Sequence, residues 1–66
     1  MNTEKTFKNI LYKKDVIDRT SMCIVQRSKF RAFFAGKNQN RKPKTETMER
    51  FLTEYGYKKI PENWVM

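Results

Sequence analysis

The chain has one cysteine, Cys23, and no histidine in its 66 residues. A single cysteine cannot form an internal disulfide, and a structural zinc site needs about four nitrogen or sulfur ligands. A chain this short buries only about 60% of the surface that its unfolded form exposes. We therefore expect a single domain, residues 1–66, that a small hydrophobic core holds together without a metal or another cofactor.

Apolar residues recur at helical spacing in three segments, and such positions share one face of a helix. They are Phe7, Ile10 and Leu11 within residues 3–14; Phe30, Phe33 and Phe34 within residues 26–35; and Met48, Phe51, Leu52 and Tyr55 after Thr45. Gly36 and Gly56 follow the last two segments, where helices commonly end. The pattern predicts an all-α fold, a compact domain of four to five helices, with Thr3 and Thr45 as N-caps.

Residues 15–25 are harder to interpret. A further helix with Val16 and Ile17 pointing inward is favoured, but the β-branched content also allows a strand at residues 22–25. Residues 22–25 are a continuous apolar run that includes Cys23, so we expect a buried structural thiol. The run is far shorter than the roughly 20 residues of a membrane span, and no apolar leader precedes it. We expect a cytoplasmic chain without a membrane partner.

The positive charge is concentrated in the middle of the chain. The net charge is +8, and no Asp or Glu lies between residues 19 and 45, a window that holds eight Lys and Arg. Acids and bases outside this window cancel, so its 27 residues carry the whole net charge. An acid-free segment of this length repels itself and favours a polyanionic partner. A nucleic acid is the expected ligand.

Residues that could support catalysis are scarce. No histidine is available as a general base, and no glycine-rich phosphate loop is present. Asp15 and Asp18 are three residues apart, which suits helix capping and solubility better than paired acid–base chemistry. We therefore expect a protein that is not an enzyme and has no small-molecule ligand.

The segment from Val25 to Gly56 has a distinctive order. Residues 28–37 read SKFRAFFAGK, a polar loop follows, residues 43–52 read PKTETMERFL, and Tyr55 precedes Gly56. This order resembles the Cro/CI-type (lambda-repressor-like) helix-turn-helix family of phage regulators. In that family a recognition helix ends in a similar aromatic-small-Gly-Lys sequence, followed by a proline-containing loop and a similar helix. The resemblance covers about half of the chain.

The resemblance implies a helix-turn-helix whose second helix, beginning near Gln26, enters the major groove of double-stranded DNA. The residues that match the base-reading positions are Gln26, Arg27, Ser28 and Arg31. The residues expected to bind phosphates are Lys29, Lys37, Asn38, Asn40, Arg41, Lys42 and Lys44. The implied function is a sequence-specific transcriptional regulator of phage or plasmid repressor type, in a bacterial or phage-infected host, that binds its operator as a homodimer.

Residues 56–66 form an apolar tail after the last predicted helix. Because Pro61 would break a continued helix, we expect this tail to pack on the body of the domain or on a second subunit. Its candidate dimer contacts are Tyr57, Ile60 and Trp64.

Two other classes of function remain open. One is an excisionase-like or architectural protein that bends DNA, which a strand at residues 22–25 would favour. The other is a small basic inhibitor that binds an acidic host protein.

Overall fold

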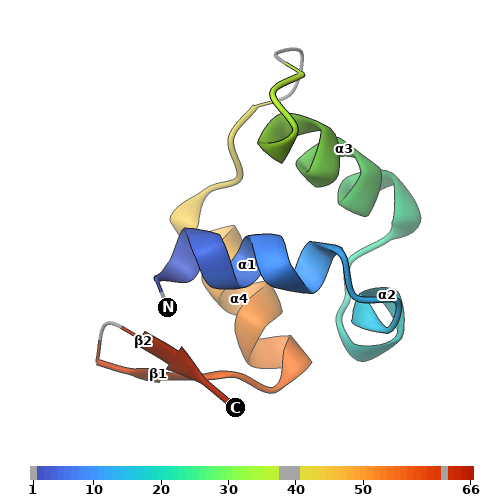
Figure 1. Cartoon of the computed structure of the whole chain (residues 1–66). Coiled ribbons are helices and arrows are strands. Elements are labelled where there is room, and N and C mark those ends of the chain that lie inside the picture. Colours follow the sequence, from blue (N-terminus) through green and yellow to red (C-terminus); the bar gives the residue numbers. More distant parts are fainter. Residues whose placement is uncertain (1, 38–40, 62) are drawn as a thin grey trace.

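The computed structural model describes residues 2–37, 41–61 and 63–66. Within these residues the chain forms four helices, followed by a two-stranded antiparallel hairpin (Figure 1). The elements are α1 (Thr3–Leu11), α2 (Val16–Arg19), α3 (Ile24–Phe34), α4 (Thr45–Tyr55), β1 (Lys58–Ile60) and β2 (Asn63–Val65). The fold is therefore mostly helical, and the prediction of an all-α domain is wrong for the tail.

The core forms where α1 crosses α4 (Figure 1). Phe7 of α1 is fully buried and stacks on Phe51 of α4, with ring centroids 6.2 Å apart. Phe30 of α3 meets the edge of Phe7 at 5.4 Å, and Phe34 also packs against the core. The prediction that the phenylalanines of this segment face the core is confirmed for Phe30 and Phe34. However, α3 contains no fully buried residue.

The helix ends differ in part from the predictions. Asn2 is the N-cap of α1, and its side-chain oxygen accepts a hydrogen bond from the backbone N–H of Lys5 at 2.7 Å. Thr3 is instead the first residue of that helix, and Thr45 likewise follows the N-cap Lys44. These cap predictions are wrong because each helix begins one residue earlier than they assume, so that the predicted cap is itself the first residue of the helix. Gly56 ends α4 with a φ of 121°, a conformation that favours glycine.

Residues 15–25 form the short helix α2, a connection at residues 20–23, and the first turn of α3. No strand forms at residues 22–25, because Ile24 and Val25 already belong to α3. Cys23 is exposed, so the prediction of a buried thiol is wrong. Its sulfur accepts a hydrogen bond from the backbone N–H of Gln26 at 3.4 Å, and the Gln26 side chain accepts one from the backbone N–H of Cys23 at 3.0 Å. This reciprocal capping box holds the thiol at the solvent-facing start of α3.

Side-chain contacts attach α2 and the following connection to α4. The hydroxyl of Tyr55 donates a hydrogen bond to Asp15 at 2.6 Å, and the guanidinium of Arg19 lies 4.4 Å from the centre of the Tyr55 ring. The backbone N–H and the hydroxyl of Ser21 both donate to the carboxylate of Glu54, at 2.8 and 2.9 Å. The segment that leads into α3 is thereby fixed to the core.

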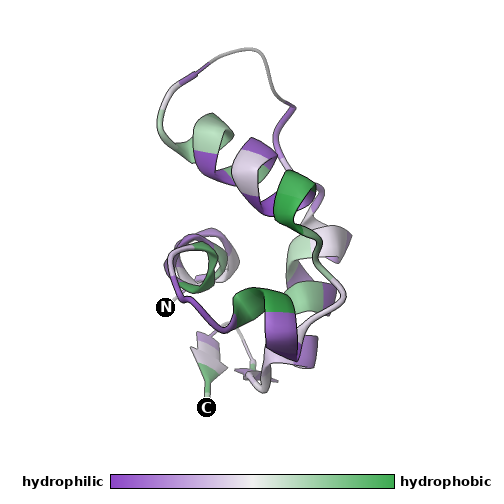
Figure 2. Ribbon diagram, turned by 90° about the vertical axis from the view of Figure 1, so that its right-hand side faces the viewer, coloured by the Kyte–Doolittle hydropathy of each residue, from purple (hydrophilic) through white to green (hydrophobic). Residues whose placement is uncertain are grey.

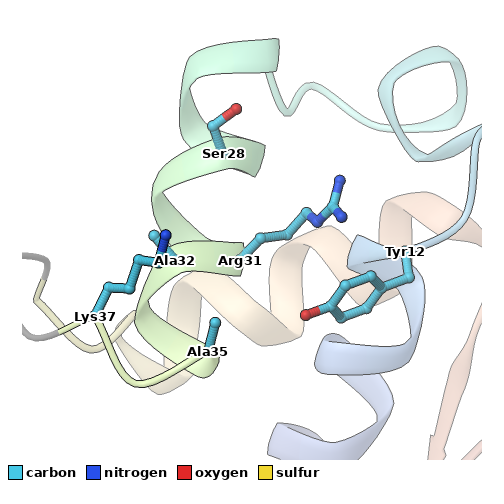
Figure 3. A pocket seen from close by; sticks show the side chains of 6 residues that line it. All are labelled: Tyr12, Ser28, Arg31, Ala32, Ala35 and Lys37. Carbon is cyan, nitrogen blue, oxygen red and sulfur yellow. The ribbon is translucent and has the colours of Figure 1, made fainter.

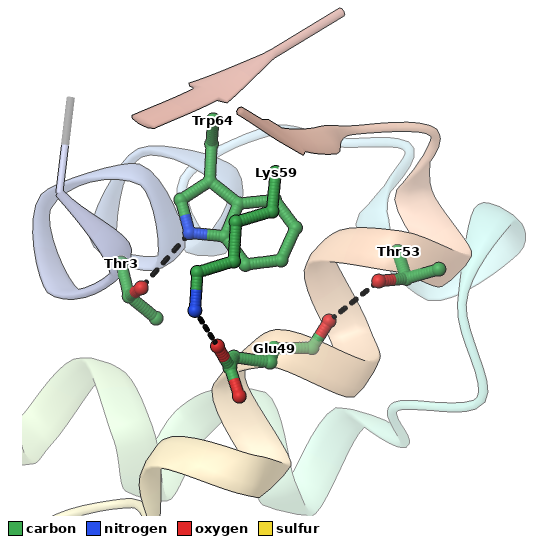
Figure 4. Close-up of polar contacts among 5 residues, drawn as sticks. All are labelled: Thr3, Glu49, Thr53, Lys59 and Trp64. Atoms are coloured by element: carbon green, nitrogen blue, oxygen red, sulfur yellow. Dashed lines mark hydrogen bonds and ion pairs between the residues drawn. The ribbon is translucent and has the colours of Figure 1, made fainter. Parts of the chain in front are cut away.

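The tail folds back on its own chain. Trp64 of β2 is buried, and its indole N–H donates a hydrogen bond to the Thr3 hydroxyl at 2.9 Å (Figure 4). Lys59, which pairs with Trp64 across the hairpin, forms a 2.6 Å ion pair with Glu49 of α4. Opposed residues in a hairpin share one face, so this face covers the helices. Pro61 lies between the two strands and not inside a helix.

No helix in the described part of the chain is both long enough and apolar enough to cross a membrane.

Candidate nucleic-acid interface

The third helix lies at the edge of the helical body, with one side on the core and the other in solvent (Figure 1). We call its exposed residues, together with its exposed C-cap Ala35, the outer face of α3: Ile24, Val25, Ser28, Lys29, Arg31 and Ala35. The inner side carries Phe30 and Phe34. Figure 2 shows that the first turn of α3 is strongly hydrophobic, whereas hydrophilic residues interrupt the later turns. Two of the predicted base-reading residues, Ser28 and Arg31, belong to this outer face.

The other two predicted base-reading residues have contacts within the domain. The Nε of Arg27 donates a hydrogen bond to the backbone carbonyl of Leu11 at 2.8 Å, and its Nη2 donates to that of Lys13 at 3.3 Å. Carbonyls at the end of a helix lack partners within the helix, so Arg27 caps the C-terminal end of α1. Gln26 takes part in the capping box with Cys23. Either side chain would have to break these contacts to read a base.

A shallow hollow of about 290 Å³ lies between the outer face of α3 and the end of α1. It is lined by Tyr12, Ser28, Arg31, Ala32, Ala35 and Lys37 (Figure 3). In this hollow Arg31 and Tyr12 point toward one another, with the guanidinium carbon 4.7 Å from the centre of the ring. Contacts of this kind attract a cation to the face of an aromatic ring. Tyr12 therefore holds the charge of Arg31 beside the hollow.

Most of the predicted phosphate-binding residues are exposed. Lys29 lies on the outer face of α3, and Lys37, Arg41, Lys42 and Lys44 lie between α3 and α4. Lys42 is engaged with Glu4 of α1 in an exposed ion pair of 3.4 Å. Asn38 and Asn40 lie outside the described residues. The structure thus places five of the seven residues in the solvent, on or after α3.

The acidic residues lie on other elements. α3 contains none. Asp15 is bound to Tyr55 and Arg19, Glu49 to Lys59 of the hairpin, and Glu54 to Ser21 of the connection before α3. The hydrogen bond from Tyr55 lowers the pKa of Asp15, and the hydrogen bond from the Ser21 backbone lowers the pKa of Glu54. Both groups therefore stay ionised at neutral pH. None of these acids belongs to α3, so its outer face keeps the positive charges of Lys29 and Arg31.

The predicted dimer contacts have separate environments. Trp64 is buried in the core of its own chain, so it is not exposed to a second subunit. Tyr57 is half-buried and stacks on Tyr55 at 6.1 Å, whereas Ile60 is exposed. Val65 and Met66, which are not among the predicted dimer contacts, are also exposed. Ile60, Val65 and Met66 are therefore the large apolar side chains exposed among the described residues of the tail.

Metal-ligating side chains do not gather into a site. Within residues 2–37, 41–61 and 63–66, no three histidine, cysteine or acidic side chains come together.

No family model, curated protein or solved structure matches this chain. The functional assignment therefore depends on the geometry and charge of the outer face of α3.

Proposed function

We propose that the chain is a sequence-specific regulator of transcription, of phage or plasmid repressor type, that binds double-stranded DNA. In this proposal α2, residues 20–23 and α3 act as a helix-turn-helix, and the outer face of α3 enters the major groove. A major groove about 12 Å wide admits a helix of this kind. The observation that carries the proposal is the outer face of α3, which is exposed, bears cations and lacks acids. The opposite side of the same helix packs on the core through Phe30 and Phe34.

The basic residues near α3 suit the phosphate backbone. Lys29 lies on the helix itself, and Lys37 and Arg41, which are both exposed, lie between α3 and α4. Contacts of this kind set the register of a protein on DNA without reading its sequence. In the proposed complex, they hold the duplex while the first turns of α3 meet the base edges.

The proposed operator is two-fold symmetric and takes two copies of the chain. Each copy supplies one α3 to a half-site. The tail is the proposed contact between copies, through Tyr57 and Ile60. Burial of Trp64 in its own chain leaves this contact to the half-buried Tyr57 and the exposed Ile60. Sedimentation of the chain with and without DNA measures the number of copies bound.

The decisive experiment is a selection of bound duplexes from random DNA at about 150 mM salt, where charges are screened over roughly 8 Å. An enriched palindrome is expected. Retention without a consensus would favour the architectural class of DNA-bending protein, and no retention would favour an acidic protein partner. Either of these results would overturn the proposal.

A matched pair of variants tests the orientation of the complex. Lys29→Gln removes a charge from the outer face of α3, and Lys58→Gln removes the same charge from the exposed hairpin. The first variant is expected to reduce the dependence of log affinity on log salt by about one, as one lost phosphate contact does. The second should leave that slope unchanged. Equal effects of the two variants would contradict the orientation.

A further inference from the structure

Two adjacent large apolar side chains are exposed on the outer face of α3. Ile24 is 70% exposed and Val25 is 60% exposed, although both belong to the first turn of a helix that packs on the core. A single exposed hydrophobic residue is normal and needs no explanation. Here, however, two exposed apolar residues are neighbours, and they lie at the start of the helix proposed to bind DNA. This pair indicates a ligand with apolar groups at that position.

The polar side chains of the same turn are occupied within the domain. Gln26 caps the start of α3, and Arg27 binds the carbonyls of Leu11 and Lys13. The usual donors for reading purines, a bidentate glutamine on adenine or a bidentate arginine on guanine, are therefore engaged elsewhere. What the first turn offers to a groove is hydrocarbon from Ile24 and Val25.

We propose, on the basis of the proposed function, that Ile24 and Val25 contact the C5-methyl groups of thymines in the major groove. Thymine is the one base of unmodified DNA that presents a methyl group there. The half-site then contains thymine opposite the first turn of α3. Ser28 lies one helical turn beyond Ile24 on the same face, where its hydroxyl can bond a base edge next to the methyl contact.

The charges around the pair favour DNA over an apolar protein partner. Lys29 is exposed on the same helix, and α3 has no acid to repel a phosphate. The positive end of the α3 dipole also lies at this turn, where it attracts an anionic ligand. A duplex supplies both the negative charge and the methyl groups, whereas a hydrophobic protein surface would leave these charges without a partner.

The experiment replaces thymines with deoxyuridine, one at a time, in the duplex obtained by selection. The replacement removes only the methyl group and keeps the base pair. For the wild-type chain, affinity should fall about fourfold at each contacted thymine, as expected for the loss of one buried methyl group. The double variant Ile24→Ala/Val25→Ala should bind the thymine and deoxyuridine duplexes equally. Met66→Ala, which shortens an exposed apolar residue outside the proposed contact between copies, is the control and should keep the fourfold ratio.

The outcomes separate this inference from the function on which it rests. If the wild-type chain selects a consensus but no deoxyuridine replacement changes its affinity, the inference is wrong and the proposed function stands. If no consensus is selected, both fail. A double variant that binds more weakly but keeps the fourfold ratio would also overturn the inference. Helical content measured by circular dichroism checks that the double variant, altered only at exposed positions, is folded.

Discussion

The two roles available to Arg27 predict opposite results for one substitution. As a base reader, Arg27 would affect DNA specificity and not stability. As the cap of α1, it holds α3 in place through its bonds to the carbonyls of Leu11 and Lys13. We expect Arg27→Ala to destabilise the domain strongly and to impair DNA binding only through the lost position of α3.

The size of the effect follows from the two bonds. The partly buried bond at 2.8 Å comes from a charged donor and contributes about 1.5 kcal/mol. The exposed bond at 3.3 Å, together with the favourable charge at the end of α1, adds about 0.5 kcal/mol. A loss of about 2 kcal/mol is roughly half of the stability of a domain this small. It corresponds to a fall in Tm of about 8–16 °C.

Urea denaturation followed by the fluorescence of Trp64, which is buried in the native state, measures this loss directly. Arg31→Ala is the control, because Arg31 is exposed and its ring contact with Tyr12 contributes about 0.5–1 kcal/mol. An Arg27→Ala chain with the wild-type urea midpoint but relaxed sequence preference would refute the capping role. It would restore Arg27 as a base reader.

Two further predictions concern the connection between α2 and α3. Cys23→Ser should keep the capping box and the wild-type stability, whereas Cys23→Ala should lower the free energy of unfolding by about 1 kcal/mol. Thermal denaturation of the two variants measures the difference, and equal Tm values would contradict the capping role of residue 23. Because the bonds from Ser21 lower the pKa of Glu54 in the folded chain, the stability they give is present above the unfolded value of 4.5 and is lost as pH falls through the folded value. Glu54→Gln should therefore be less stable than wild type at pH 7, and the gap should narrow toward pH 3; a gap that is constant with pH would rule out this linkage.

Helical periodicity predicted α1, α3 and α4 because each contributes its apolar residues to the core at a spacing of three and four. Phe7 and Phe51 are fully buried at such positions. The hairpin was missed because each strand has only three residues, too few to show an alternating pattern. Trp64 alone occupies a buried position in β2.

The contacts of the candidate site could not be predicted from the sequence, because they depend on the tertiary structure. The sequence position of Arg27 predicts a base reader, because nothing in the local sequence indicates its partners, the carbonyls at the end of α1, which are far away along the chain. The apolar run at residues 22–25 predicts a buried Cys23, but the structure divides this run between a connection and a helix. The acid-free window, in contrast, was already visible as a one-dimensional pattern, and it coincides with an exposed helix and the connection after it.

The absence of fully buried residues in α3 has a consequence for its motion. Elements with few buried apolar contacts open in local fluctuations that cost less free energy than global unfolding. The backbone amides of α3 should therefore exchange with deuterium sooner than those of α1 and α4, which contain the fully buried Phe7 and Phe51. A ligand bound to α3 opposes this opening. The backbone amides of α3 should therefore show the largest gain in protection from deuterium exchange when the ligand binds.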